Sequence, residues 1–433
     1  MSLFGSLTAA ISGLTAQSRA LGHISDNVAN SQTVGYKRVD TNFVSYLTSS
    51  SASMHLPGAT IARPSYTNST QGTVEQSENS LALAISGQGF FAVAASTGTS
   101  NGQPVFDDRQ FFTRAGDFGL DQDGYLVNGS GYYLKGWPAD ANGNPDRTDL
   151  APIRVSQQVF NPVATTEIEL GANLPSSIED NASVSTQTEL YDALGTLHTV
   201  NLTFTKNSNN DWTMSIDVPD AVTATAGTVD LRFGAAVSPT TTPGTLGDLA
   251  NATGSIVLPP SANAGDLAAV TFEVDFGQGV QTVSLNLGAF GEAQGLTQYG
   301  AEFGIRNRNQ NGVPLGSYSG LSIATNGDIS VNYDNGQSRV VARIPLVAFN
   351  DPDALQRLDG QAFMRTPESG EARITDASSN GVGKLVISSV ERSNVDIATE
   401  FTKLILAQRA YTANTKVVTT SDEMLQDTIN MRR

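Results

Sequence analysis

The chain has 433 residues, of which 41 are glycine and 15% are charged. This length allows two or three domains, and the composition fits turn-rich β domains better than disorder, which combines low hydrophobicity with high charge. The net charge of −17 argues against binding to nucleic acid or anionic lipid. The chain contains no cysteine, which excludes disulfides and thiolate metal sites.

The N-terminus predicts an amphipathic helix from about Leu3 to Val28. Its apolar residues recur at alternating steps of three and four, the heptad pattern of a helix that packs on other helices. A secretory signal is not expected, because Arg19 is the first basic residue and the apolar residues are periodic instead of continuous. We therefore expect export without a cleaved signal peptide. The expected contact residues of this stripe are Leu7, Ile11, Leu14 and Leu21.

The middle of the chain predicts β structure. Apolar residues alternate in short runs separated by turn sequences such as Asn326-Gly327 and Asn335-Gly336. We predict an extended connector over residues 31–72 plus 376–393, because this part is rich in Ser, Thr and Asn. Residues 73–150 plus 292–375 are predicted to form an inner β-domain. Residues 151–291, with 14 acidic and 3 basic side chains, are predicted to be an inserted outer acidic β-domain.

The C-terminus predicts a second amphipathic helix from about Ile397. Ser393 and Asp396 have the spacing of a capping box at its start. One heptad position is polar three times in succession, which in paired helices fixes register and partner number. Residues 1–30 plus 394–433 are thus expected to form a terminal helical domain, an antiparallel coiled coil. The expected contact residues here are Phe401, Leu404, Gln408, Tyr411, Thr415, Val418 and Leu425.

No group of residues predicts catalysis or a cofactor. The three histidines, His23, His55 and His198, have no metal-ligand spacing and no local acidic partner in sequence. Short acidic runs from Asp121 and Asp140 resemble pieces of calcium loops but lack the glycine and glutamate that such loops require. No apolar run approaches the roughly 20 residues that cross a bilayer. We predict a building block with no cofactor, no metal and no membrane insertion, and not an enzyme.

Several short motifs stand out in the sequence. At the N-terminus the motif is ANSQTVGYK over residues 29–37. At the C-terminus the motifs are SNVD over residues 393–396 and QRAYTAN over 408–414. Within the β region they are LAISGQGFF over residues 83–91 and TRAG over 113–116. Together these motifs resemble those of a known family, the rod and hook group of bacterial flagellar axial proteins.

The central motifs are more similar to the hook members of this group than to its rod members. They are YDALGTLH over residues 191–198, TQYG over 297–300 and PLVAF over 345–349. The resemblance fades between about residues 219 and 270. It also departs from the usual forms at DPDAL, residues 351–355, and at GQA, residues 360–362.

The resemblance implies a curved tube of one protein, a flexible joint that transmits torque from the flagellar rod to the filament. It also implies these partners: copies of the chain itself, the rod, hook-cap and hook–filament junction proteins, and the flagellar export apparatus. The terminal helices would pair and line a central channel.

Two alternatives stay open. One is a flagellar rod component, although the length and the 151–291 insertion argue against it. The other is a secreted β-rich adhesin or carbohydrate-binding protein. That function needs an exposed aromatic platform, whereas Trp137 and Trp212 both lie in strand-like sequence and are expected to be buried.

Overall fold

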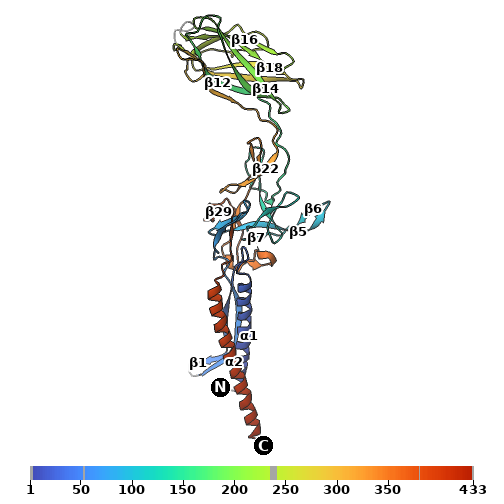
Figure 1. The fold of residues 1–433 in the computed structure, drawn as a ribbon. Coiled ribbons are helices and arrows are strands. Elements are labelled where there is room, and N and C mark those ends of the chain that lie inside the picture. The colour runs from blue at the N-terminus through green and yellow to red at the C-terminus, as the bar shows by residue number, and fades with distance from the viewer. Residues whose placement is uncertain (1–2, 52–53, 235–240, 380, 432–433) are drawn as a thin grey trace. The chain divides into compact units, whose positions relative to one another are not determined.

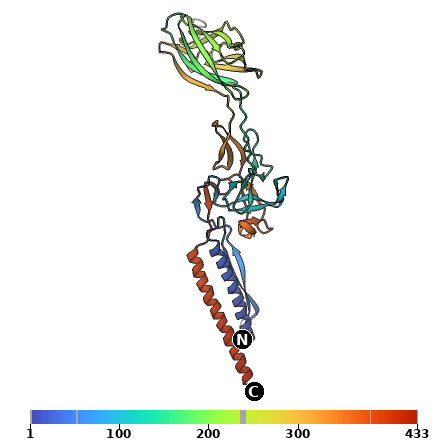
Figure 2. The same ribbon diagram turned by 45° about the vertical axis from the view of Figure 1, so that its right-hand side comes forward.

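The computed structural model describes residues 3–51, 54–234, 241–379 and 381–431 (Figures 1 and 2). The fold is mainly β with helical ends, as predicted. The chain forms two compact units: unit 1 comprises Met1–Gln157, Ser319–Asn332 and Ser338–Arg433, and unit 2 comprises Gln158–Tyr318 and Tyr333–Gln337. The finer division into four parts stays a prediction.

Helices α1 (Leu3–Ala29) and α2 (Ile397–Asn430) lie side by side in unit 1 (Figure 2). Their direction follows from two contacts. Gly13 lies beside Asn414, and Asn27 near the end of α1 meets Glu400 near the start of α2. The helices are therefore antiparallel, as the heptad patterns predict.

The predicted capping box at Ser393 is wrong. Asp396 is the N-cap of α2, and its carboxylate accepts a hydrogen bond from Thr399 N at 2.9 Å. The side chain of Asn394 accepts from Arg38 N and donates to Thr70 O, which holds this stretch in an extended path. The helix can begin only after that anchor.

Much of the first part of the predicted connector, residues 31–72, pairs into a long hairpin. Strand β1 (Val39–Ser51) runs antiparallel to β2 (Met54–Tyr66), starting with the pair Val39 and Tyr66. The hairpin also contacts α1, where Thr60 N donates to Ser12 Oγ at 3.1 Å. The sequence predicts extended backbone here, but its polar composition hides the packing partner.

The rest of unit 1 is built of short strands. The main sheet has the order β22-β23-β24-β10-β5-β7-β27-β26, and small pairs join β4 to β29 and β3 to β30. Along the main sheet the strands are β22 (Tyr318–Ile323), β23 (Asp328–Tyr333), β24 (Ser338–Arg343), β10 (Tyr132–Pro138), β5 (Phe90–Ser100), β7 (Phe111–Thr113), β27 (Ala362–Met364) and β26 (Gln356–Arg357).

The remaining elements of unit 1 attach to this framework. Branch strands of the main sheet are β6 (Gln103–Phe106), β8 (Gly119–Leu120), β9 (Leu126–Val127), β11 (Ala151–Pro152), β25 (Leu346–Ala348) and β28 (Arg373–Thr375). The small pairs and short helices are β3 (Val74–Gln76), β4 (Leu83–Ser86), β29 (Lys384–Ile387), β30 (Ser389–Glu391), η2 (Pro352–Ala354) and η3 (Asp359–Gln361). The core contains Phe90, whose ring meets Phe349 and Phe363 edge to face.

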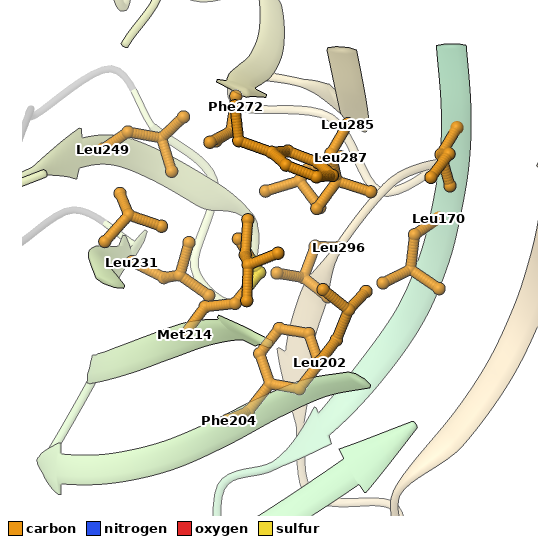
Figure 3. Packing of buried hydrophobic residues seen from close by; sticks show 14 of the residues in the cluster. Leu170, Leu202, Phe204, Met214, Leu231, Leu249, Phe272, Leu285, Leu287 and Leu296 are labelled. Carbon is orange, nitrogen blue, oxygen red and sulfur yellow. The ribbon is translucent and has the colours of Figure 1, made fainter. Parts of the chain in front are cut away.

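Unit 2 consists of two sheets that enclose one hydrophobic core (Figure 3). In most strands, buried and more exposed residues alternate, so each sheet contributes one apolar face. One sheet contains β13 (Ser183–Tyr191), β14 (Leu197–Ser208), β15 (Asp211–Asp217), β16 (Thr225–Phe233) and β17 (Leu246–Ala250). The other contains β12 (Glu167–Pro175), β18 (Leu267–Asp275), β19 (Val280–Ala289), β20 (Thr297–Tyr299) and β21 (Gly304–Gln310).

The two tryptophans are buried, as predicted. Trp212 is fully buried in the core of unit 2, and Trp137 is 4% exposed in unit 1. Neither can serve as a surface platform for a sugar ring, so the feature that would favour a carbohydrate-binding protein is not provided by these residues.

The alternation along β14 gives a testable contrast. Leu202 is fully buried, whereas Leu197 on the same strand is 50% exposed. Leu202→Ala should lower the free energy of unfolding of unit 2 by about 2–5 kcal/mol, because it leaves a cavity in the core. Leu197→Ala should change it by less than about 0.5 kcal/mol. Urea unfolding followed by Trp212 fluorescence, in a Trp137→Phe background, measures both, and equal effects would contradict the two-sheet core.

Candidate assembly surface

A buried ion triad fastens the helical end of unit 1 to its strands. Glu391, the last residue of β30, accepts hydrogen bonds from Lys37 Nζ at 2.5 Å and from Arg114 at 2.9 Å. It also accepts one from Gly72 N at 2.8 Å. The charged side chains are at most 2% exposed, so water neither screens nor replaces these bonds.

The triad holds two cations against one carboxylate, and backbone oxygens satisfy further donors. Lys37 Nζ donates to Thr70 O at 2.7 Å, and Arg114 donates to Gly87 O at 2.8 Å. Burial lowers the pKa of Lys37 to about 8, against the opposing attraction of Glu391. Burial also acts to raise the pKa of Glu391, but the charges of Arg114 and Lys37 outweigh it and hold that pKa below its usual value.

A second polar cluster ties both helices to the hairpin. The side-chain amide of Asn27 donates to Val39 O at 2.9 Å and to Glu400 Oε2 at 3.1 Å, and its oxygen accepts from Val39 N. Glu400 is 1% exposed and accepts from Lys403 at 2.7 Å. The end of α1, the start of β1 and the start of α2 are thereby fixed to one another.

The chain between these clusters passes through Gly35, whose conformation needs glycine. Its φ is +70°, and a Cβ there would lie 2.4 Å from Ala115 N. Gly35 N also donates to Glu391 O at 2.8 Å.

These residues are the ones that sequence reasoning missed. Lys and Glu are rarely buried, so Lys37 and Glu391 are not expected in a core. The sequence feature that could have indicated this buried ion cluster is a charged residue next to a strand, such as Arg114 directly after Phe111-Phe112-Thr113.

Many of the buried residues of the two helices have small side chains. Ala10, Ala16 and Ala20 of α1 are buried, as are Ala407 and Ser421 of α2. A Cβ on Gly13 would lie 3.0 Å from the Asn414 amide, which shows how closely the helices approach. Small residues bury little apolar area, so this pairing leaves larger side chains uncovered.

The predicted contact residues lie beside this interface. Half-buried positions are Leu7, Leu14, Leu21, Leu404, Val418 and Leu425, and exposed positions are Ile11, Phe401, Gln408, Tyr411 and Thr415. The fold of the single chain therefore covers the predicted stripes only in part.

Helix α2 carries apolar residues on both sides of its contact with α1. At about 100° per residue, one side presents what we call the aromatic flank: Ile397, Phe401, Gln408 and Tyr411. The other side presents the aliphatic flank: Leu406, Val417 and Met424. Between the flanks, facing away from α1, runs a polar strip of Thr402, Arg409, Thr412 and Lys416, which also contains the exposed apolar residue Ile405.

The exposure of the flanks is large for apolar residues. Phe401 is 51% exposed and Tyr411 is 42% exposed, while Leu406 and Met424 are 62% and 54% exposed. Contiguous exposed apolar surface of this kind marks an interaction site.

The other sequence candidates have structural partners. The carboxylates of Asp121 and Asp140 accept backbone N–H groups two and four residues on, which closes turns. His23 bonds Thr41 at 2.9 Å, and His198 stacks on Phe276 beside Asp192 and Asp220. The side chain of His55 is outside the described residues.

Two further properties concern the described part of the chain. There, no group of three or more His, Asp or Glu side chains is placed to hold a metal ion. Over the same residues, no helix is both long enough and apolar enough to cross a bilayer.

Comparison with protein families gives four matches. Residues 7–37 match the flagella basal body rod protein family, and residues 84–186 match the flagellar hook protein FlgE/F/G D1 domain. Residues 163–313 match the flagellar basal body protein FlaE D2 domain, and residues 388–431 match the flagellar basal body rod FlgEFG protein C-terminal family.

Individual relatives match along the whole chain. The chain is 33% identical over 439 residues to the flagellar hook protein FlgE of Brucella abortus, with 100% of both chains covered. It is 29% identical over 446 residues to the FlgE of Salmonella typhimurium, covering 99% of this chain and 100% of the relative.

Among solved structures, the Helicobacter pylori flagellar hook protein FlgE2 is similar at a TM-score of 0.50 and 14% identity, over 73% of this chain and 100% of that chain. At this identity the likeness concerns the fold alone.

The triad predicts unequal effects of removing its members. Glu391→Gln leaves two buried cations without their counter-charge and should lower the free energy of unfolding of unit 1 by about 3–5 kcal/mol. Lys37→Met keeps the Arg114–Glu391 pair and should lower the free energy of unfolding by clearly less than Glu391→Gln does. Thermal unfolding of the two variants compares them, and a Lys37→Met loss equal to that of Glu391→Gln would contradict the shared-carboxylate arrangement.

The lowered pKa of Lys37 predicts a pH dependence. Above pH 8 the folded chain has released the Lys37 proton, but the unfolded chain, with an ordinary pKa of 10.5, still holds it. Since the unfolded state then binds more protons, the Lys37 contribution should make unit 1 more stable as pH rises from about 8 to 10. Urea unfolding of the wild type and of Lys37→Met across this pH range isolates the Lys37 contribution. A difference in the free energy of unfolding between the two proteins that stays constant with pH would refute the prediction.

Proposed function

We propose, on the premise that the chain belongs to the flagellar hook protein family, that its terminal helices form the inner wall of the hook and hold neighbouring copies through the flanks of α2. Family membership makes the chain a structural, non-enzymatic subunit that polymerises within the bacterial flagellum. The observation that carries the proposal is the apolar surface of α2, which its own chain leaves uncovered.

The arrangement of side chains around α2 supports a position inside a tube. One side is occupied by α1 and the two flanks offer apolar contacts to a copy on either side. The remaining side is the polar strip, in which Thr402 and Thr412 suit water although Ile405 is an exposed apolar member, so we place this side against the central channel. A contact between two different surfaces need not close on itself and generates a helical tube.

The β parts supply the remaining layers of the proposal. We place residues 73–150 plus 292–375 in an inner β layer and the acidic segment 151–291 in an outer layer. Polar, hydrated contacts between outer layers allow sliding more readily than packed apolar cores. A tube with a stiff inner wall and a yielding exterior can bend while it transmits torque.

The position of such a tube in the flagellum determines which other proteins it contacts. We propose that its ends contact the flagellar rod and the hook-cap and hook–filament junction proteins. We also propose that the flagellar export apparatus delivers the chain without a cleaved signal peptide. The exposed apolar side chains of both helices support this route, because helices that lack much of their packing are marginal in water before assembly.

Two neighbouring exposed residues test the flank assignment. Phe401→Asp places a charge in an apolar contact and should abolish tube formation and motility. Thr402→Asp, on the polar strip one residue away, should preserve both. Electron microscopy of hooks on cells and of purified polymers reads the outcome, with thermal unfolding of the monomers as the control for folding. Normal tubes from Phe401→Asp would refute the assignment.

A further inference from the structure

An open groove lies within unit 1 between the two helices and the hairpin. It has a volume of about 630 Å³, within the range of about 300–1,000 Å³ typical of binding clefts. We call it the helix–hairpin groove, and its principal apolar residues are Ala20, Ile24, Val39, Phe43, Leu406 and Ala410.

The groove is apolar at its base, and the charged side chains at its rim are bonded to one another. Lys403 donates to Asp40 at 2.6 Å and to Glu400 at 2.7 Å, so the charges beside the groove are already paired. Phe43 is 44% exposed and Leu406 is 62% exposed, so apolar side chains of the groove face solvent in the single chain. The groove therefore suits an uncharged apolar occupant.

We infer that the helix–hairpin groove receives the aromatic flank of α2 from a second copy of the chain. The inference rests on the proposed function, because it assigns the surface that each flank meets. Phe401 and Tyr411 of the flank are aromatic and exposed, and no charged residue lies among them. They match the groove in polarity.

The groove and the aromatic flank also lie at the same level along the axis of α2. Groove residues on α2 fall between Glu400 and Ala410, and the flank falls between Ile397 and Tyr411. At about 1.5 Å per residue, the flank is roughly 21 Å long. A neighbour that is rotated about the tube axis and raised by a few ångströms still presents its flank at the height of the groove.

The position of the groove gives the contact its direction. Groove and aromatic flank lie on opposite sides of the α1–α2 interface, so each copy receives one neighbour and enters another. This is a heterologous contact, in which no two-fold axis is required and growth can continue.

One polar residue in the flank has a matching partner. Gln408 sits among the aromatic side chains, and the groove is also lined by Gln17 and Thr41. A side-chain amide placed against these groups can be hydrogen-bonded only at one register. The groove thus gives a specific role to the polar heptad position.

Because the chain has no cysteine, disulfide mapping tests the inference in the intact protein. Leu406→Cys marks the groove, Gln408→Cys marks the flank, and Thr402→Cys marks the polar strip as a matched control. Polymers are grown from equal mixtures of two single-cysteine chains, oxidised, and analysed by mass spectrometry of the linked peptides. We expect the Leu406→Cys chain to link to the Gln408→Cys chain and not to the Thr402→Cys chain.

The outcomes separate the inference from the proposed function. Polymers in which Leu406→Cys links only to itself, to Thr402→Cys or to nothing overturn the groove assignment and leave the polymer intact. Failure of the unmodified chain to form tubes overturns the proposed function and this inference with it.

A second variant gives an independent measurement. Phe43→Asp changes an exposed groove residue and should raise the concentration needed for polymerisation by at least about tenfold, with unchanged thermal unfolding of the monomer. An unchanged polymerisation threshold in a folded Phe43→Asp variant would overturn the assignment.

Discussion

The pairing of Glu391 with Lys37 and Arg114 is the constraint on which unit 1 depends. These residues come from the segment after α1, from the β region and from the strand before α2, so one carboxylate joins three distant parts of the chain. A charge in a dry site must keep its partners, because removing one leaves an uncompensated ion. The triad therefore fixes where both helices leave the strands.

The helices and unit 2 differ in how much of their stability comes from contacts within the chain. The buried residues of the helices include Ala16, Ala20 and Ala407, which contribute little apolar area, and Asn27 and Glu400 join the end of α1 to the start of α2. Unit 2, in contrast, has a closed core with residues such as Leu202, Trp212 and Phe272 fully buried. The chain thus combines a β unit that has its own closed core with helices whose large apolar side chains stay exposed in the single chain.

The sequence allowed the helices, much of the strand pattern and the polymeric character to be predicted, because all three depend on local periodicity. The alternation from Thr199 to Thr205 predicts a half-buried strand, and β14 contains it. The triad could not be predicted, because burial of Lys37 depends on partners far away in sequence. The start of α2 at Ile397 was predicted correctly, but the capping box at Ser393 was wrong for the same reason, since Asn394 is held by the segment near Thr70.

The candidate assembly surface could likewise be predicted from the sequence only in part. The heptad pattern predicts Phe401 and Tyr411 as contact residues, and both are exposed in the single chain, although the pattern does not tell which partner would cover them. The hairpin that completes the groove was not foreseen, because its polar sequence predicts extension without a packing surface. Half of each proposed contact was therefore visible in the sequence, and the complementary half required the fold.

The two opposed flanks of α2 have a consequence for how a tube can start. A copy joined to one neighbour covers only one flank, whereas a copy within a lattice covers both, so the first few associations recover a small part of the available free energy. Assembly of this kind has a costly nucleus and a favourable elongation, as helix formation itself does. Free subunits in solution then remain dispersed, and tubes lengthen where an existing end already displays unfilled grooves.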